Sequence, residues 1–174
     1  MRNNRFPQFP HQNGYPGAWR GKFARLTPIE SALMRWYLTQ HAANILEVWY
    51  DVRADGNPAT DESQDLSHLT NDPAMRRMWQ QQTAKRLDAI TLEPAGYRVV
   101  ELRQRAAQET VGEVTTYNQV SRAEWPDLTW LNPRIVTLQV DPIIRRTLEA
   151  IGFDVVIAPP QSVFRPTPLA AKRG

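Results

Sequence analysis

The chain has 174 residues, of which 41% are hydrophobic, and its formal net charge is +3. This length predicts one domain with a buried core and short tails. The sequence contains no cysteine and only three scattered histidines, which excludes disulfides, thiolate metal sites and a His-rich metal site. No run of about 20 apolar residues is present, so neither a transmembrane helix nor membrane contact is expected. The polar residues 1–10 do not resemble a signal peptide.

The charge is unevenly distributed. Residues 1–26 and 159–174 hold eight basic residues, no acidic residue and seven of the 14 prolines, whereas residues 27–158 hold 13 basic residues against all 18 acidic ones. Basic, proline-rich ends are typical of extended arms on a folded body. Such arms can contact nucleic acid or acidic protein surfaces, and solubilising tails are the alternative. The arm residues proposed for these contacts are Arg2, Arg5, Arg20, Lys22, Arg25, Arg165, Lys172 and Arg173.

The body begins with a predicted helix and strand. Thr27-Pro28-Ile29-Glu30 has the pattern of a capping box with proline at the first helical position. An apolar stripe at helical spacing follows and extends to about Asn44. Residues 45–52 then read as a strand with one apolar face, formed by Leu46, Val48, Tyr50 and Val52.

A turn at 55–58 and an acidic loop separate this strand from a predicted helix that starts at Asp72-Pro73. Residues 87–92 and 97–103 then read as a β-hairpin, joined by Glu93-Pro94-Ala95-Gly96. The remaining expected elements are a helix over 108–124, a strand over 134–140, a helix from Asp141-Pro142 to Gly152, and a strand over 153–158.

These elements predict an α/β fold with a mixed β-sheet flanked by helices. The hairpin requires antiparallel pairing, whereas the last strand–helix–strand unit implies parallel pairing. Strand residues of a sheet that is covered on both faces are buried. We therefore expect burial of Leu87, Ile90, Val100 and Val136.

One group of polar residues has the pattern of a reactive site. Asp88 lies on the first hairpin strand, and Glu101 and Arg103 lie two residues apart on the second, hence on one of its faces. Acids on paired strands can share a divalent cation such as Mg²⁺. A neighbouring cation can stabilise a metal-bound hydroxide or a transition-state phosphate. The sequence lacks a phosphate-cradling glycine loop and a nucleophile elbow.

Short stretches of the sequence resemble the core of the PD-(D/E)XK nuclease superfamily, in particular small phage and prophage proteins of that fold. They are Tyr50-Asp51-Val52-Arg53-Ala54-Asp55-Gly56, Lys85-Arg86-Leu87-Asp88-Ala89-Ile90, Val99-Val100-Glu101-Leu102-Arg103, and Val111-Gly112-Glu113 through Tyr117. The resemblance covers about residues 27–158. It implies a nuclease-like core, with Mg²⁺ held by Asp88 and Glu101 if the site is active.

The sequence departs from that family pattern at two positions. The catalytic lysine of the superfamily would fall on Arg103, which stays protonated and is too wide to replace an ammonium that activates water. The glutamine of the following helix would fall on Glu113, which adds a negative charge, and clustered acids without a metal raise one another's pKa. Glu30 can complete such a site, but we favour its role in the capping box.

Two interpretations therefore remain open. The favoured one is that Asp88, Glu101, Arg103 and Glu113 are vestiges of an ancestral active site, in a structural component of a phage particle such as a head–tail connector, neck or adaptor ring. It implies no cofactor, other virion proteins as partners, a homo-oligomeric ring, and a location in the virion after assembly in the host cytoplasm. The alternative is a Mg²⁺-dependent DNA endonuclease.

The two arms are expected to contact other chains, or DNA, more than their own domain. Aromatic residues supply anchors for such docking, and the N-terminal arm offers Phe6, Phe9, Tyr15 and Trp19. The alternative is that these aromatic side chains fold back onto their own domain.

Overall fold

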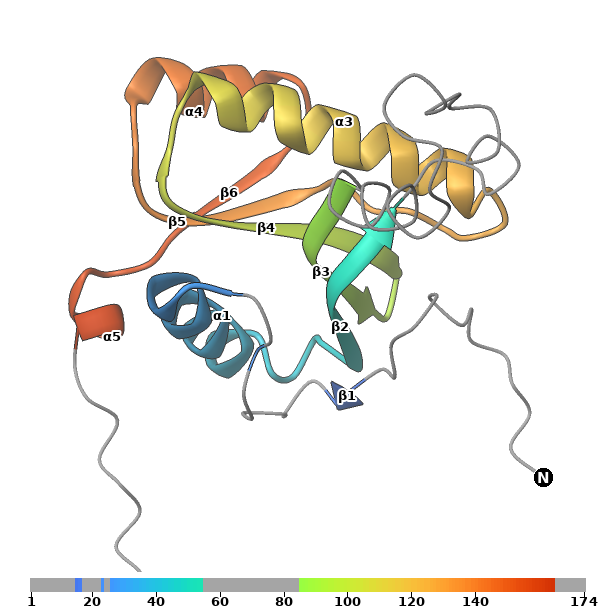
Figure 1. The fold of residues 1–174 in the computed structure, drawn as a ribbon, viewed down its shortest axis with the longest axis horizontal. Helices are drawn as coiled ribbons and strands as arrows, with labels where there is room; N and C mark the ends of the chain where they lie inside the picture. Colours follow the sequence, from blue (N-terminus) through green and yellow to red (C-terminus); the bar gives the residue numbers. More distant parts are fainter. Residues whose placement is uncertain (1–14, 17–22, 24–25, 55–84, 165–174) are drawn as a thin grey trace, which may run out of the picture.

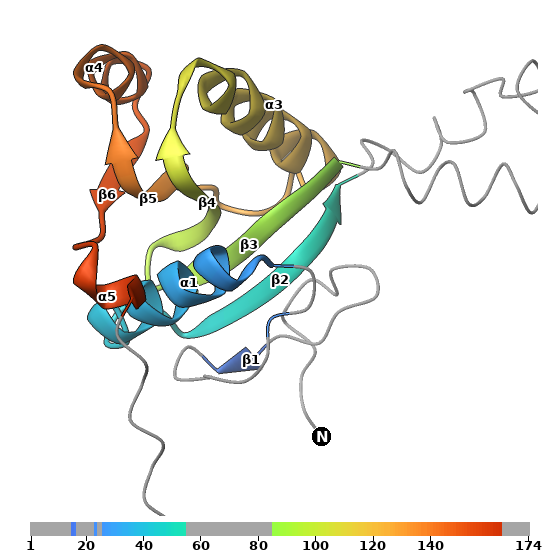
Figure 2. The same ribbon diagram turned by 60° about the vertical axis from the view of Figure 1, so that its left-hand side comes forward.

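The computed structural model describes residues 15–16, 23, 26–54 and 85–164 (Figure 1). The elements in chain order are β1 (Tyr15–Pro16), α1 (Pro28–Gln40), β2 (Glu47–Ala54), β3 (Lys85–Glu93), β4 (Gly96–Ala106), α3 (Gln108–Glu124), β5 (Arg134–Val140), α4 (Pro142–Ala150), β6 (Asp154–Ile157) and α5 (Gln161–Phe164). The strands form one six-stranded sheet in the order β1-β2-β3-β4-β5-β6. Helices α3 and α4 lie on one face of the sheet and α1 on the other (Figures 1 and 2). The predicted α/β fold with a helix-flanked mixed sheet is confirmed.

Helix α1 starts as predicted and ends earlier than predicted. The Glu30 amide donates to Thr27 Oγ1 at 3.3 Å, and the Thr27 amide donates to Glu30 Oε2 at 2.8 Å, which completes the capping box. The helix ends at Gln40, because residues 41–44 form a turn in which the Asn44 amide donates to the His41 carbonyl at 2.9 Å. Its buried face packs on the sheet through Leu33, Met34, Tyr37 and Leu38.

Strand β2 is antiparallel to β3, and two residues depart from its predicted apolar face. Val48 and Tyr50 are buried in the cluster under α1, whereas Val52 is buried in the cluster against α3, because Asp51 has a φ of 51° and interrupts the alternation. Leu46 is 53% exposed. Leu46 lies before the first residue of β2, so the alternation of the strand does not yet apply to it. The helix predicted from Asp72 lies outside the described residues.

The β3–β4 hairpin turns at Gly96, which has a φ of 145°. A side chain at this position would collide with the backbone carbonyl of Thr129. That carbonyl accepts a hydrogen bond from the Tyr97 amide at 2.8 Å, and the Leu131 amide donates back to the Tyr97 carbonyl at 2.7 Å. Glycine therefore lets the chain after α3 approach β4 closely.

Two parallel crossovers complete the sheet. Strand β4 pairs in parallel with β5 across α3, and β5 pairs in parallel with β6 across α4. Apolar residues pack on both faces of the sheet, one cluster against α1 and two against α3 and α4. Burial is confirmed for the four predicted core residues Leu87, Ile90, Val100 and Val136, each with 0% exposure.

The described parts of both predicted arms pack on their own domain. Strand β1 pairs with β2, so that Tyr15 lies opposite Val48. Phe23 is buried and meets Tyr50 edge-on, with ring centroids 4.7 Å apart. In α5, Val163 packs against the α1 cluster. For these residues the structure shows the fold-back contacts of the alternative. The expectation that the arms mainly contact other chains stays a prediction, because the remaining arm residues lie outside the described ones. None of the described helices is long and apolar enough to cross a membrane.

Candidate functional site

The sheet forks between β3 and β4. Their pairing runs from Glu93–Gly96 only as far as Ala89–Val100. Beyond this point β3 continues along β2, and β4 continues along β5. Figure 2 shows the two strands diverging. Helix α3 lies over the diverging strands.

Asp88 lies at the start of the fork. Its Oδ2 atom accepts a hydrogen bond from the Leu102 amide at 2.8 Å. The carboxylate therefore pairs with a backbone N–H of β4 just where the regular strand-to-strand pairing ends. The side chain is 19% exposed, so it is largely withdrawn from solvent.

The side chains of Glu101 and Arg103 meet on one face of β4, as the period of two predicts. Arg103 Nη2 lies 2.6 Å from Glu101 Oε1 and 2.5 Å from Glu113 Oε2, and Arg103 Nη1 lies 3.9 Å from Asp88 Oδ2. Glu113 projects from α3. The four residues that the sequence analysis singled out thus come together, and we refer to them as the carboxylate–arginine cluster.

Burial dominates the electrostatics of the cluster. It raises the pKa of Asp88 from 3.8 to about 6, against the lowering effects of the Leu102 hydrogen bond and of Arg103. It also raises the pKa of Glu101 well above 4.5, with a further upward contribution from Asp88. The three carboxylates together outweigh the desolvation of Arg103 and raise the pKa of its guanidinium. Arg103 therefore stays charged, whereas the buried acids resist ionisation.

Two further residues act on the cluster. Glu30 lies close enough to raise the pKa of Asp88 and Glu101 by its charge, although its own carboxylate is engaged in the capping box. Tyr117, one turn beyond Glu113 on α3, has its pKa raised to about 12 by burial and then by Glu101 and Glu113. The sequence analysis placed Tyr117 at the end of a family-like stretch without giving it a role, and its electrostatic contact with the acids follows from the helical spacing.

As arranged, the residues of the cluster do not fit a divalent metal ion. In the part of the chain that the structure describes, no group of three His, Cys, Asp or Glu side chains is placed to hold one. The guanidinium of Arg103 already contacts an oxygen of both Glu101 and Glu113. A cation bound to the same oxygens would sit beside a permanent positive charge. The chemistry that this arrangement supports is charge neutralisation by Arg103.

A second polar network, which the sequence analysis missed, lies on the α1 side of β4 and β5. Arg98 Nε lies 2.7 Å from Glu93 Oε1, and Arg98 Nη1 lies 2.8 Å from Asp154 Oδ2. Arg134 Nη2 also lies 2.9 Å from Asp154 Oδ2, and its Nη1 donates to the Tyr37 hydroxyl at 2.9 Å. The pairs join residues up to 97 positions apart, so no local motif indicates them.

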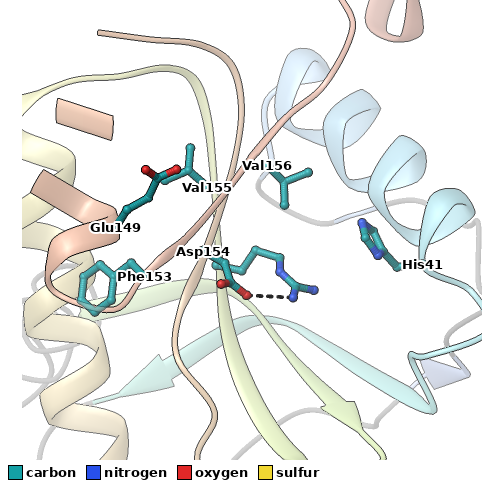
Figure 3. Close-up of a pocket in the computed structure, with 7 residues that line it drawn as sticks. His41, Glu149, Phe153, Asp154, Val155 and Val156 are labelled. Carbon is teal, nitrogen blue, oxygen red and sulfur yellow. Dashed lines mark hydrogen bonds and ion pairs between the residues drawn. The ribbon is translucent and has the colours of Figure 1, made fainter. Parts of the chain in front are cut away.

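This network borders a cavity of about 310 Å³ beside β6. His41 reaches it from the end of α1, while Glu149 and Phe153 line it from the α4 side (Figure 3). Asp154 bridges Arg98 and Arg134 and thereby links the cavity to the network. Because the acids and arginines here are paired with one another, the network serves to fix β4, β5 and β6 together.

The structure does not test the proposed arm contacts. Arg2, Arg5, Arg20, Lys22, Arg25, Arg165, Lys172 and Arg173 all fall outside the described residues. Their role in binding a partner or DNA stays a prediction.

Comparison with known proteins gives few matches. No family model matches this chain, and no curated protein matches it. Two similar solved structures are a repair endonuclease from Pyrococcus abyssi (18% identity, TM-score 0.38, 43% of this chain and 33% of that chain) and an EndoMS–dsDNA complex (21% identity, TM-score 0.38, 45% and 32%). A third is the protein of unknown function AF1548 (9% identity, TM-score 0.42, 74% and 57%). The chain thus spans about a third of the length of the two endonuclease chains.

Proposed function

We propose that this protein is a non-cleaving building block of a larger assembly, with a nuclease-like core in which Arg103 takes the position of a catalytic cation. The observation that carries the proposal is the contact of one guanidinium with the carboxylates of Glu101 and Glu113, with Asp88 at 3.9 Å.

An arginine in this position disfavours phosphodiester hydrolysis for two reasons. Its pKa is raised further by the surrounding acids, so it cannot accept a proton from water. Its donors are also committed to Glu101 and Glu113, which leaves those carboxylates partly neutralised and unable to act as strong ligands or bases.

The assembly role is supported by the distribution of charge and by exposed apolar residues. The two arms carry eight basic residues and the body has five more acids than bases, so copies of the chain can attract one another. Large apolar side chains are exposed at both ends of α4 and at the end of β6, namely Ile143, Ile151 and Ile157. The more specific role as a head–tail connector, neck or adaptor ring of a phage particle rests on the resemblance of the sequence to small phage proteins.

A Mg²⁺-dependent DNA endonuclease is the second candidate, and one observation favours it. Glu101 Oε2 is buried and has no hydrogen-bond partner among the described residues. A buried carboxylate oxygen without a partner is costly. A divalent ion would satisfy it only in an arrangement in which the Arg103 guanidinium has left Glu101.

A cleavage assay separates the two candidates. Full-length protein is incubated with supercoiled, linear and single-stranded DNA in Mg²⁺ and in Mn²⁺, beside Asp88→Asn and Arg103→Lys. We expect no cleavage by the unmodified protein. Cleavage that Asp88→Asn abolishes would overturn the proposal in favour of the enzyme. Activity gained only with Arg103→Lys would identify Arg103 as the group that blocks the site.

The phage assignment needs its own test. Quantitative mass spectrometry of purified particles from the source should detect this chain. Its number of copies per particle should equal the number of subunits in one ring, or a small multiple of that number. Its absence from purified particles would overturn the virion role and leave the cleavage result untouched.

A further inference from the structure

Strand β6 ends the sheet, and its outer backbone groups face away from it. In the parallel ladder with β5, the Asp154 amide donates to the Pro133 carbonyl at 2.9 Å, and the Ala158 amide donates to the Thr137 carbonyl at 2.8 Å. Because strand residues alternate in direction, the N–H and C=O groups of Val155 and Ile157 point toward the outer edge. No strand of the described residues pairs with that edge.

Strand β6 is a short edge of four residues, and shortness is one way in which proteins limit pairing at an edge. It carries none of the other usual protections within the strand, namely lysine, proline or a bulge. The sequence of β6 is Asp154-Val155-Val156-Ile157, which is β-branched after its first residue. Ile157 is 44% exposed, and the adjacent α4 segment exposes Ile143 and Ile151 at 65% and 48%. The edge thus combines unpaired backbone with exposed apolar side chains.

One hollow follows most of the strand. The cavity of Figure 3 is lined by Phe153, Asp154, Val155 and Val156, together with His41 and Glu149 on either side. An extended segment that paired with β6 would therefore find space beside these residues. A second cavity, of about 500 Å³, lies at the ends of β4 and β5, and Ile157 is its one lining residue from β6.

We propose that β6 pairs antiparallel with β6 of a second copy of this chain, with the two-fold axis at Val156. In this register Val155 of each copy faces Ile157 of the other. Each such pair exchanges two backbone hydrogen bonds, so the outward groups on both strands are satisfied. Pro159 would come opposite Phe153 of the second copy, and because proline has no N–H the pairing stops there.

The same register gives the cavity of Figure 3 an occupant. The chain after β6 continues as Ala158-Pro159-Pro160. In the antiparallel arrangement this segment of the second copy passes Asp154 and Phe153, which line the cavity. Proline rings pack well against aromatic side chains. His41 is the partly exposed aromatic residue that lines this cavity, whereas Phe153 is 7% exposed and belongs to the core.

The charge of this corner favours a second copy over the basic arms or DNA. Residues 142–158 carry two arginines, one glutamate and one aspartate, and therefore have no net charge. A basic arm would bind best to an acidic surface, and a phosphate backbone would bind best to a basic one. Arg145 and Arg146 precede Glu149 along α4. A two-fold axis that reverses β6 also reverses α4. Because Arg145 pairs with Glu149 in its own helix, the favourable contact across the axis would be that of Arg146 with the acidic end of the other helix.

The inference deepens the proposed assembly role, but its test is independent of the cleavage assay because it measures self-association alone. Sedimentation velocity over a concentration series compares the full-length protein with Ile157→Lys and with Leu46→Lys. Both substitutions replace an exposed apolar residue, and only the first lies on β6. We expect a dimer whose dissociation constant rises at least about tenfold in Ile157→Lys, and no change in Leu46→Lys. Thermal melting followed by circular dichroism verifies that each variant folds.

Disulfide cross-linking between two copies tests the proposed register of the β6 strands. The sequence has no cysteine, so Val156→Cys introduces a single thiol. Two residues that face each other across an axis in a non-hydrogen-bonded pair have Cα atoms about 4.5 Å apart, within disulfide range. Ile157→Cys is the matched control, since its copies would lie beyond the limit of about 7 Å. We expect oxidation to link the Val156→Cys dimer far faster than the Ile157→Cys variant.

Three outcomes would overturn the proposal. One is a protein that stays monomeric at all concentrations. Another is a dimer that Ile157→Lys leaves intact and Val156→Cys does not link, which would place self-association elsewhere, for example in the arms. The third is equal linking of the two cysteine variants, which would exclude the register centred on Val156.

Discussion

Arg103 and Glu101 project from the same face of β4, and Arg103 Nη2 lies 2.6 Å from Glu101 Oε1. Glu101 is 1% exposed, whereas Arg103 is 24% exposed. The carboxylate is thus held inside the fold by a cation that reaches it from the fork. Because the other oxygen of Glu101 has no hydrogen-bond partner among the described residues, the charge of this side chain depends strongly on Arg103.

Arg103→Ala should destabilise the protein by about 3 kcal/mol at pH 7, because it leaves a buried carboxylate without its cation. The loss should be smaller near pH 5, since Glu101 has a raised pKa and can become neutral. Urea unfolding at the two pH values measures the effect. Arg105→Ala is the control in the same strand: its side chain is exposed, so a change within about 0.5 kcal/mol is expected. Equal losses in both variants would show that the cluster contributes nothing specific.

Asp88 should make the protein less stable as the pH rises from about 4 to about 6. Its folded-state pKa is raised to about 6 from 3.8, so in this window the folded protein binds more protons than the unfolded chain. The contribution of Asp88 to the free energy of unfolding is then fully present below pH 3.8 and is lost as the pH passes 6. Glu101, with its raised pKa, acts in the same direction.

Asp88→Asn tests this dependence. The amide oxygen of asparagine can still accept the Leu102 hydrogen bond, but it does not titrate. Between about pH 4 and pH 6, the free energy of unfolding should decrease in both proteins. The decrease should be about 1–2 kcal/mol smaller in the variant than in the unmodified protein, as measured by urea unfolding. Asp127→Asn, at an exposed position, should follow the unmodified curve. A pH profile of Asp88→Asn that coincides with that of the unmodified protein would contradict the raised pKa.

The network around Arg98 should matter more for stability than an exposed ion pair. Arg98 is 11% exposed and contacts Glu93, Asp154 and the Asn132 carbonyl, so Arg98→Ala is expected to reduce the free energy of unfolding by about 3–5 kcal/mol. Arg145 pairs with Glu149 one turn away on α4, and both side chains are about half exposed. Arg145→Ala should therefore lose no more than about 0.5 kcal/mol. Chemical denaturation of both variants decides the matter, and similar losses would refute the structural role of the network.

The carboxylate–arginine cluster could be predicted because its residues obey short-range rules. Glu101 and Arg103 share a face through the two-residue period of a strand, and Asp88 joins them through the hairpin. Glu113 follows from the next helix. The fork itself was not predicted, since nothing in the sequence marks Ala89–Val100 as the last pair of the ladder.

The parts that sequence reasoning missed depend on distant contacts. Arg98, Arg134 and Asp154 meet because two parallel crossovers set the register of β4, β5 and β6, and a register of this kind has no local signal. Strand β1 has only two residues, which is too few for any periodic pattern. Tyr15 could be recognised as an aromatic anchor, but only the observed pairing with Val48 shows that its partner is its own domain.

The cation at the fork is covalently part of the chain. A metal ion exchanges with solution and can be removed by a chelator. Arg103 is a side chain, so every molecule contains it. It connects β4 to Asp88 on β3 and to Glu113 on α3. The junction of these three elements should therefore hold in media without free divalent ions, and its strength should respond to acidity rather than to metal supply.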